Sequence, residues 1–293
     1  MDGFLNVLKP PGMTSHDVVY RVRRLAAAKA GHGGTLDPGA AGVLPVAVGR
    51  ATRLTEFLLD REKAYRAEVT LGISTDTADG FGTVTGRRPA AVGESALASA
   101  AAALVGEHLQ VPPMTSAVSV GGVRLHQLAR RGLSVQRPPR RAVVSGCRLL
   151  RSMPAGSCQR VLLDITCSKG TYVRLLCEAF GEHLGLPAHM SFLIRTAAGP
   201  FHLAGASTLE ELALDPESCL LPMDWPLKHL PALVVGPHEA EAVSHGLPFT
   251  PAEAPGEGAV RVLDEGGRLL AVATISPQGK LRYDKVLSEG GAR

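Results

Sequence analysis

The chain has little that would direct it to a membrane or hold it together with disulfides. No apolar run approaches the roughly 18–20 residues that a membrane-spanning helix needs. The first six residues place no basic segment before an apolar stretch, so a signal peptide is not expected. The five cysteines are odd in number and form no CxxC pair, which fits neither a zinc site nor a disulfide framework. We therefore expect a cytoplasmic protein with reduced, mostly buried thiols.

Acidic residues are missing from a long central interval. Between Glu107 and Asp164 there is none, and the interval holds nine arginines: Arg124, Arg130, Arg131, Arg137, Arg140, Arg141, Arg148, Arg151 and Arg160. Residues 1–200 carry 24 Lys and Arg against 14 Asp and Glu, whereas residues 201–293 carry 7 against 13. This asymmetry favours a first part that faces a polyanion. The alternative is a solvated basic face, which is less favoured because an unpaired arginine cluster repels itself.

Length and patterning predict two domains of an α+β protein. A chain of 293 residues with 45% hydrophobic content is long and apolar enough for a sizeable core. Period-2 alternation predicts a strand over Lys63–Leu71. A helix should begin at Thr14 or Ser15 and end at Gly31. Because helical and strand segments alternate without a GxGxxG fingerprint, we expect a mixed sheet rather than a doubly wound one.

A composition change near residues 222–231 predicts a domain boundary. Proline, Trp225 and a charge reversal cluster there. Beyond it, two apolar segments flank Glu265-Gly266-Gly267, which predicts a hairpin in a small all-β module. We expect domains at 1–230 and 231–293.

Asp37 is the carboxylate whose setting suggests chemistry. It lies in the segment Gly31-His32-Gly33-Gly34-Thr35-Leu36-Asp37-Pro38-Gly39, whose glycines and proline fix the loop shape. From the residues alone, Asp37 is either a turn aspartate that bonds its own backbone or a reactive group on a rigid loop. A phosphate-binding loop is weakly supported, because the segment lacks GK[ST] and GxGxxG.

Four motifs in order give this segment a specific resemblance. The Asp37 segment resembles the catalytic signature of the TruB family of tRNA pseudouridine synthases. Three further segments resemble the other motifs of that family: Lys9-Pro10-Pro11-Gly12-Met13-Thr14-Ser15, then Lys63–Ala67 together with Thr75–Gly80, and finally Cys167–Arg174. Together these motifs cover most of residues 3–200, and the tail resembles the family's PUA-like RNA-binding module.

The resemblance implies isomerisation of the T-loop uridine of tRNA, at position 55, to pseudouridine by a catalytic domain with a mixed sheet. The N-glycosidic bond breaks, the base rotates and a C–C bond forms, with no cofactor. No metal, nicotinamide or ATP motif is present. By resemblance, Asp37 is the catalytic carboxylate, Arg174 is its cationic partner and Tyr65 offers a ring for stacking and a hydroxyl for proton transfer. Whether Asp37 attacks covalently or acts electrostatically stays open.

The resemblance also implies contacts with the substrate. His32 would fill the space left when the uridine is extruded. The other expected substrate-binding residues are Lys9, Tyr172, Leu193, Arg130, Arg131, Arg140 and Arg141. The last four lie in an Arg-rich insert, about 108–145, that would clasp the RNA. The sequence departs from the family pattern at Thr115, Ser119 and His126, which bears on contacts between this insert and RNA.

Ordinary structural roles remain possible interpretations for several of these residues. Without the motifs, Tyr65 is an ordinary strand tyrosine, and Tyr172 and Leu193 are plain core residues. The whole chain could instead modify another RNA, depend on a guide RNA, or act as an RNA-folding protein by binding. We expect the T-arm of tRNA as partner and a monomer without metal or membrane.

Overall fold

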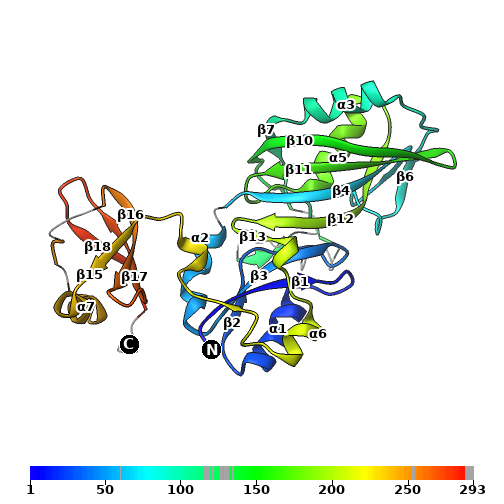
Figure 1. The fold of residues 1–293 in the computed structure, drawn as a ribbon. Helices are drawn as coiled ribbons and strands as arrows, with labels where there is room; N and C mark the ends of the chain where they lie inside the picture. The colour runs from blue at the N-terminus through cyan, green and yellow to red at the C-terminus, as the bar shows by residue number, and fades with distance from the viewer. Residues whose placement is uncertain are drawn as a thin grey trace.

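The computed structural model describes residues 1–59, 61–114, 116, 119–120, 122–125, 128, 132–133, 135–247, 249–251 and 255–287 (Figure 1). Helices are α1 (Ser15–Ala26), α2 (Thr55–Leu59), α3 (Glu94–Ala103), α5 (Val173–His183), α6 (Leu209–Leu214) and α7 (Pro237–Ser244). The strands of the N-terminal half are β1 (Gly3–Lys9), β2 (Ala30–His32), β3 (Ala41–Val48), β4 (Lys63–Leu71), β5 (Ile73–Thr75), β6 (Val84–Arg87), β7 (Gly106–Gln110), β8 (Ser119–Val120) and β9 (Val123–Arg124). The remaining strands are β10 (Arg140–Ala155), β11 (Cys158–Cys167), β12 (Ala188–Ala198), β13 (Phe201–His202), β14 (Leu220–Leu221), β15 (Ala232–Val235), β16 (Gly258–Asp264), β17 (Leu269–Ile275) and β18 (Leu281–Val286).

One mixed sheet organises the larger part of the chain, which confirms the α+β prediction. Its order is β14-β1-β3-β12-β4-β11-β10-β7, with β2 beside β3 and β13 beside β12. The pairs along this path are antiparallel except for β3 and β12, which run parallel and meet only at Ile194↔Ala41 and Arg195↔Gly42. This short seam joins the two halves seen in Figure 1.

The seam needs glycine at position 42. Gly42 has a φ of +110°, which L side chains rarely adopt. A Cβ there would overlap the Arg195 carbonyl oxygen and lie 2.7 Å from its backbone nitrogen. Gly42 therefore lets β3 approach β12 closely.

The helix after Thr14 forms as predicted but ends earlier. Thr14 and Asp17 make a capping box, and the buried Val18 and Val22 pack under the sheet. The helix stops at Ala26, and Ala27 adopts a left-handed φ of 46°. The prediction that Gly31 ends it is wrong, because Gly31 lies in β2, opposite Ala47 of β3.

The second half of the sheet is covered on one face by α3 and α5 (Figure 1). The β4 strand spans Lys63–Leu71 as its alternation predicts, between β11 and β12. Its inward residues Ala67 and Val69 are fully buried against those helices. This packing fixes the strand that carries Tyr65.

The C-terminal module contains the predicted hairpin, but it is not all-β. Strands β16 and β17 pair antiparallel across the predicted turn. However, β15 pairs parallel to β16, and a parallel neighbour requires a crossover connection, in which α7 lies. The sheet order is β15-β16-β17-β18.

This module packs on the N-terminal half of the main sheet. Leu269, Val272 and Leu287 share an apolar cluster with Phe4 and Leu227. The Lys285 ammonium lies 2.8 Å from the Glu56 carboxylate across the same boundary. The module and the sheet therefore share part of one core.

The cysteines carry free thiols, as expected, but fewer are buried than expected. Cys167 and Cys177 are buried, whereas Cys147, Cys158 and Cys219 are half-buried. Burial raises the pKa of the Cys147 and Cys167 thiols to about 11, which disfavours the thiolate. Within the described ranges, no helix combines the length and the apolar character needed to cross a bilayer.

Candidate active site

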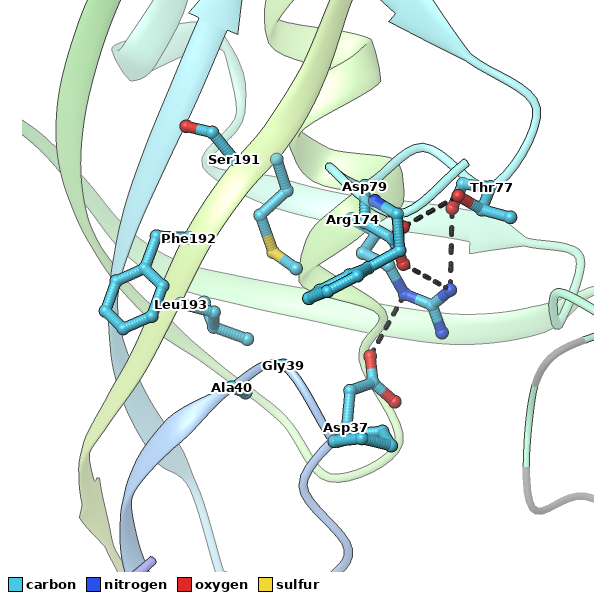
Figure 2. A pocket seen from close by; sticks show the side chains of 12 residues that line it. Asp37, Gly39, Ala40, Thr77, Asp79, Arg174, Ser191, Phe192 and Leu193 are labelled. Atoms are coloured by element: carbon cyan, nitrogen blue, oxygen red, sulfur yellow. Dashed lines mark hydrogen bonds and ion pairs between the residues drawn. The ribbon is translucent and has the colours of Figure 1, made fainter. Parts of the chain in front are cut away.

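A pocket of about 230 Å³ opens beside the seam between β3 and β12. Its wall is formed by the Asp37 loop over residues 37–40, the turn over residues 77–81, strand β12 over residues 190–193, and Arg174 of α5. These segments are far apart in sequence and meet at the sheet seam (Figure 2). The pocket is mostly apolar, with a charged cluster on one side.

That cluster is a guanidinium held between two carboxylates. Arg174 Nε lies 3.1 Å from Asp37 Oδ2, and its Nη1 lies 3.3 Å from Asp79 Oδ2 (Figure 2). Nη1 also donates to the Thr77 carbonyl at 3.4 Å. The Arg174 side chain is 4% exposed and Asp37 is 40% exposed. The arginine is thus fixed from behind and presents one edge to Asp37.

Burial raises the pKa of Asp37 above its ordinary value of 3.8. The Arg174 guanidinium opposes this shift, Asp79 adds to it, and Lys9 opposes it more weakly. A buried carboxylate favours its neutral form unless a cation faces it. Arg174 therefore opposes the protonation of Asp37 that burial in the pocket favours.

The loop that carries Asp37 is held by side chains from three other elements. Arg195 donates to the carbonyls of Gly34 at 3.0 Å and Thr35 at 3.3 Å, and from Nε to Val43 at 2.7 Å. The Ser15 hydroxyl both accepts from Leu36 N and donates to Leu36 O. Buried carbonyls in a loop need such partners, and charged donors make the strongest of these bonds. The loop geometry is thereby preorganised.

Lys9 is the third residue that holds the Asp37 loop. This buried position differs from the contact with substrate that the resemblance predicts for it. Lys9 is 0% exposed, and its ammonium donates to the carbonyls of Pro10 at 2.9 Å, Pro38 at 3.2 Å and Ala40 at 2.6 Å. Burial lowers its pKa to about 8. A side chain enclosed in this way shapes the loop from inside and offers no surface to RNA.

Tyr65 lies on β4, opposite Ile165 of β11 and Arg195 of β12. Its ring packs against the core cluster under α5. Burial raises the pKa of its hydroxyl, although Arg195, which donates a hydrogen bond to it, acts in the opposite direction. The hydroxyl therefore stays protonated at neutral pH and can donate a proton. Tyr65 is not among the residues that line the pocket, although the charge of Asp37 also contributes to raising the pKa of its hydroxyl.

The remaining expected pocket residues divide into two groups. Leu193 lines the pocket and is 6% exposed. His32 is half-buried on β2, and its Nδ1 accepts a 3.4 Å hydrogen bond from Gly34 N. Tyr172 precedes α5, where its backbone exchanges two hydrogen bonds with the Gln110 side chain. Neither His32 nor Tyr172 is among the residues that line the pocket.

The Arg-rich insert is described only in part. Arg130 and Arg131 lie outside the described residues, as do Thr115 and His126, and so does the side chain of Ser119. Arg140 and Arg141 are exposed on β10, and Arg141 forms an ion pair with Glu107 of β7.

Three residues of the pocket region escaped the sequence analysis. Asp79 stood in a motif without a role, and Phe81 follows it in the same turn. Arg195 belongs to no motif, and an arginine in a strand is usually taken as exposed, yet it is 1% exposed. A buried charge needs dedicated partners, and only the three-dimensional arrangement shows them.

Family models cover most of the main sheet. The N-terminal domain of TruB family pseudouridylate synthases matches residues 22–173, and the C-terminal domain of tRNA pseudouridylate synthase B matches residues 174–228. Similar curated proteins include "tRNA pseudouridine synthase B" of Moorella thermoacetica, 49% identical over 97% of this chain and 99% of the relative. The protein of that name from Symbiobacterium thermophilum is 52% identical over 84% of this chain and 83% of the relative.

Solved structures extend the likeness over nearly the whole chain. "Crystal Structure of a Cbf5-Nop10-Gar1 Complex" contains a chain matched with a TM-score of 0.75 and 28% identity, covering 98% of this chain and 85% of that one. "Structure of H/ACA RNP bound to a substrate RNA containing 2'-deoxyuridine" gives a TM-score of 0.76 and 26% identity, covering 99% and 86%.

Fold, site and comparisons define the chain as a pseudouridylate synthase, an isomerase that acts on uridine in RNA. Within that class it belongs to the TruB family. The resemblance that the four motifs predicted is confirmed.

Proposed function

We propose that the chain converts the T-loop uridine at position 55 of tRNA into pseudouridine, with Asp37 as the catalytic carboxylate. The carrying observation is the Asp37–Arg174 contact of 3.1 Å at the edge of an apolar pocket beside the sheet seam. The names of the relatives support tRNA as the substrate. In this proposal the chain acts as a monomer.

In this proposal the target uridine leaves its helical stack and enters the pocket. Extrusion costs a few kcal/mol in lost stacking, roughly. His32, beside the Asp37 loop, fills the vacated space, and Leu193 packs on the base from β12. Tyr172 serves as a further substrate contact at the start of α5. The residues 231–293 serve as a PUA-like module that contacts the RNA outside the pocket.

Chemistry at the sugar requires an ionised carboxylate beside it. Asp37 can attack C1′ or stabilise positive charge that develops there, and the Arg174 ion pair maintains the ionised form needed for either role. The protonated Tyr65 hydroxyl supplies a proton donor next to the base. No other reactant enters this scheme, because the product is an isomer of the substrate.

The direct test uses the purified full chain and a tRNA transcript. We expect pseudouridine at position 55 and none in a transcript that has cytidine there. Asp37→Asn keeps the side-chain size but loses the charge, so it should abolish turnover while tRNA affinity stays near that of the wild type. Chemical mapping of pseudouridine and a filter-binding titration measure the two quantities.

Each alternative gives a different result in this assay. Pseudouridine at another position would indicate another RNA target, and activity only with added RNA would indicate guide dependence. A binding protein of the RNA-folding class would make no pseudouridine and would be unaffected by Asp37→Asn. A variant that retained more than a few per cent of the wild-type rate would remove Asp37 from its proposed role.

A further inference from the structure

A large aromatic side chain stands exposed at the edge of the pocket. Phe81 is 82% exposed and lines the pocket together with the Asp37 loop. By contrast, Leu193, which lines the pocket from β12, is 6% exposed. Phe81 therefore contributes little to the core. Exposing a phenyl ring forgoes burial worth about 1.5–3 kcal/mol, so a ligand that covers it would gain from the contact.

The backbone that carries Phe81 is tied to the ion-pair cluster. Phe81 N donates to Asp79 Oδ1 at 3.0 Å, and the Thr77 hydroxyl donates to the same oxygen at 2.7 Å. The other oxygen of Asp79 faces Arg174. The carboxylate that braces Arg174 thus also positions Phe81, and only two side-chain torsions remain to be ordered on binding.

The Asp37 loop leaves room for the ring. A Cβ on Gly39 would overlap Cε2 of Phe81 and lie 2.7 Å from its Cζ. No positive φ demands glycine at position 39, so space, not backbone conformation, distinguishes this position. The ring consequently lies against the loop that carries Asp37, at the edge of the pocket that both of them line.

RNA is a continuous chain, so a uridine in the pocket brings a neighbouring nucleotide to its edge. That neighbour has lost a stacking partner through the extrusion. Every base has a π-face, and stacking on an aromatic side chain compensates this loss without depending on sequence. An exposed ring fixed at the edge of the pocket offers such a partner.

We propose that Phe81 is a stacking platform for the nucleotide next to the extruded uridine. The proposal rests on the proposed function, since it requires that a uridine occupies the Asp37 pocket. It adds an RNA contact made by this chain outside the pocket interior. It predicts that Phe81 acts on RNA affinity and leaves the chemical step, which depends on Asp37, nearly unchanged.

The test compares Phe81→Ala with Phe81→Trp in single-turnover assays on a T-arm stem-loop RNA over a range of protein concentrations. Phe81→Ala should raise the apparent Kd by about 5- to 150-fold, the range for loss of one stacked base. Its rate at saturating protein should stay near that of the wild type. Phe81→Trp should keep an affinity near that of the wild type. Added RNA should quench the tryptophan fluorescence of this variant more than that of the wild type, in which Trp225 supplies the background signal.

A second probe locates the base. Stem-loops with an abasic ribose on the 5′ or the 3′ side of the target uridine should bind wild type more weakly when the stacked base is missing. Phe81→Ala should bind that one abasic RNA and the unmodified RNA equally well. Leu214→Ala is the matched control, because Leu214 is an 88% exposed apolar side chain on α6 and does not line the pocket.

The outcomes separate the two proposals. Suppose that wild type forms pseudouridine. If Phe81→Ala then binds the unmodified RNA as tightly as wild type does, or binds both abasic RNAs more weakly than the unmodified RNA by the same factor, the stacking platform is wrong and the proposed function stands. Should Phe81→Ala lower the saturated rate with unchanged Kd, the platform is likewise wrong. Absence of pseudouridine with wild type overturns the proposed function and with it this inference.

Discussion

The Asp37 pocket and the Arg-rich insert handle positive charge in opposite ways. In the pocket region, Lys9, Arg174 and Arg195 are nearly fully buried, and their donors go to carbonyls and carboxylates of the same chain. In the insert, Arg140 and Arg141 stand in solvent on one strand. The first arrangement fixes geometry, whereas the second leaves charge available to a polyanion.

The interval without acids is less isolated in the fold than in the sequence. Arg141 pairs with Glu107 on β7, and Arg148 lies 3.3 Å from Asp164 on β11. Both acids come from just outside the interval, brought in by strand pairing. The self-repulsion that composition suggested is therefore partly relieved across the sheet. Arg140 has no acidic partner among the residues that the structure describes, so it must be distinguished from the paired Arg141.

The largest effect should come from the pocket, where geometry matters beyond charge. Arg174→Lys keeps a cation, but one ammonium cannot reproduce the contacts of Nε with Asp37 and of Nη1 with Asp79. We expect a rate loss of about 100-fold or more, close to that of Arg174→Ala, because misplacement by about 1 Å can cost that much. Single-turnover rates at saturating tRNA measure it, and near-normal rates for the Lys variant would show that charge alone suffices.

Arg174→Gln also separates charge from position through pH. In the proposed function activity needs ionised Asp37, so it should fall as pH drops through the pKa of that group, which burial raises and Arg174 opposes. Loss of the cation should raise this pKa further and move the acid limb of the rate profile to higher pH. An acid limb at the wild-type position would contradict the assignment of Asp37 as the ionised group.

Tyr65→Phe should have the next largest effect. The ring stays packed under α5 and, in the proposed function, remains available to stack on the base. The hydroxyl, whose pKa burial raises, is removed. Loss of a positioned acid or base typically costs 10²–10⁴-fold, so we expect about that fall in single-turnover rate with little change in tRNA affinity. Tyr65→Ala should weaken binding as well. A Phe variant as fast as wild type would leave Tyr65 as a stacking surface only.

Lys9→Met probes the support behind the pocket. It removes the ammonium donor from the Ala40 carbonyl and from the Pro38 carbonyl, which keeps its 2.8 Å hydrogen bond from Gly12 N. A buried polar group that loses its partner costs about 1–3 kcal/mol of unfolding free energy. Urea unfolding at neutral pH measures the loss. Turnover should fall with it, because the Asp37 loop relaxes, whereas tRNA affinity should hold.

The pH dependence gives this variant an internal control. The pKa of Lys9 is about 8 in the folded chain and 10.5 when unperturbed, so between these values the unfolded chain binds more protons. The contribution of Lys9 to stability therefore rises with pH through that window, and is at its least favourable below it. The rise should be absent in Lys9→Met. If the free energy of unfolding had the same pH dependence in both proteins, the pKa of Lys9 would not be lowered by folding.

Local pattern predicted the elements that local chemistry decides. The alternation of Lys63–Leu71 and the helix start at Thr14 or Ser15 are predicted from neighbours in sequence, and both are in place. The crossover helix α7 was missed because only the parallel pairing of β15 with β16, a non-local feature, requires it. The predicted end of the helix at Gly31 was wrong for the same reason, because the pairing of Gly31 with Ala47 of β3 is also non-local.

The site shows the same division. The family resemblance predicted Asp37 as the reactive group and Arg174, in the motif Cys167–Arg174, as its partner. The two side chains lie 3.1 Å apart. Arg195 and the enclosure of Lys9 could not be predicted, because their burial depends on the close approach at the β3–β12 seam. A buried cation and a surface cation look alike in one sequence until the partners are placed.

The smallest effects, and the sharpest contrast with the pocket, should come from the insert. If Arg140 contacts a phosphate, Arg140→Ala should reduce the slope of log affinity against log salt by up to about 0.7–0.9. Arg141→Ala should reduce it less, because Glu107 already shares that charge. In a Glu107→Gln background, Arg141 is released from its ion pair, so tRNA affinity should rise. Arg141→Ala should then reduce the salt slope as much as Arg140→Ala does.

Replacing four arginines of the insert together, Arg130, Arg131, Arg140 and Arg141, should reduce the slope further. Filter binding of tRNA at several salt concentrations measures all of these, with Asp37→Asn added in each protein so that turnover does not alter the RNA. Slopes that remain at the wild-type value would place the RNA elsewhere and leave these arginines as a solvated face.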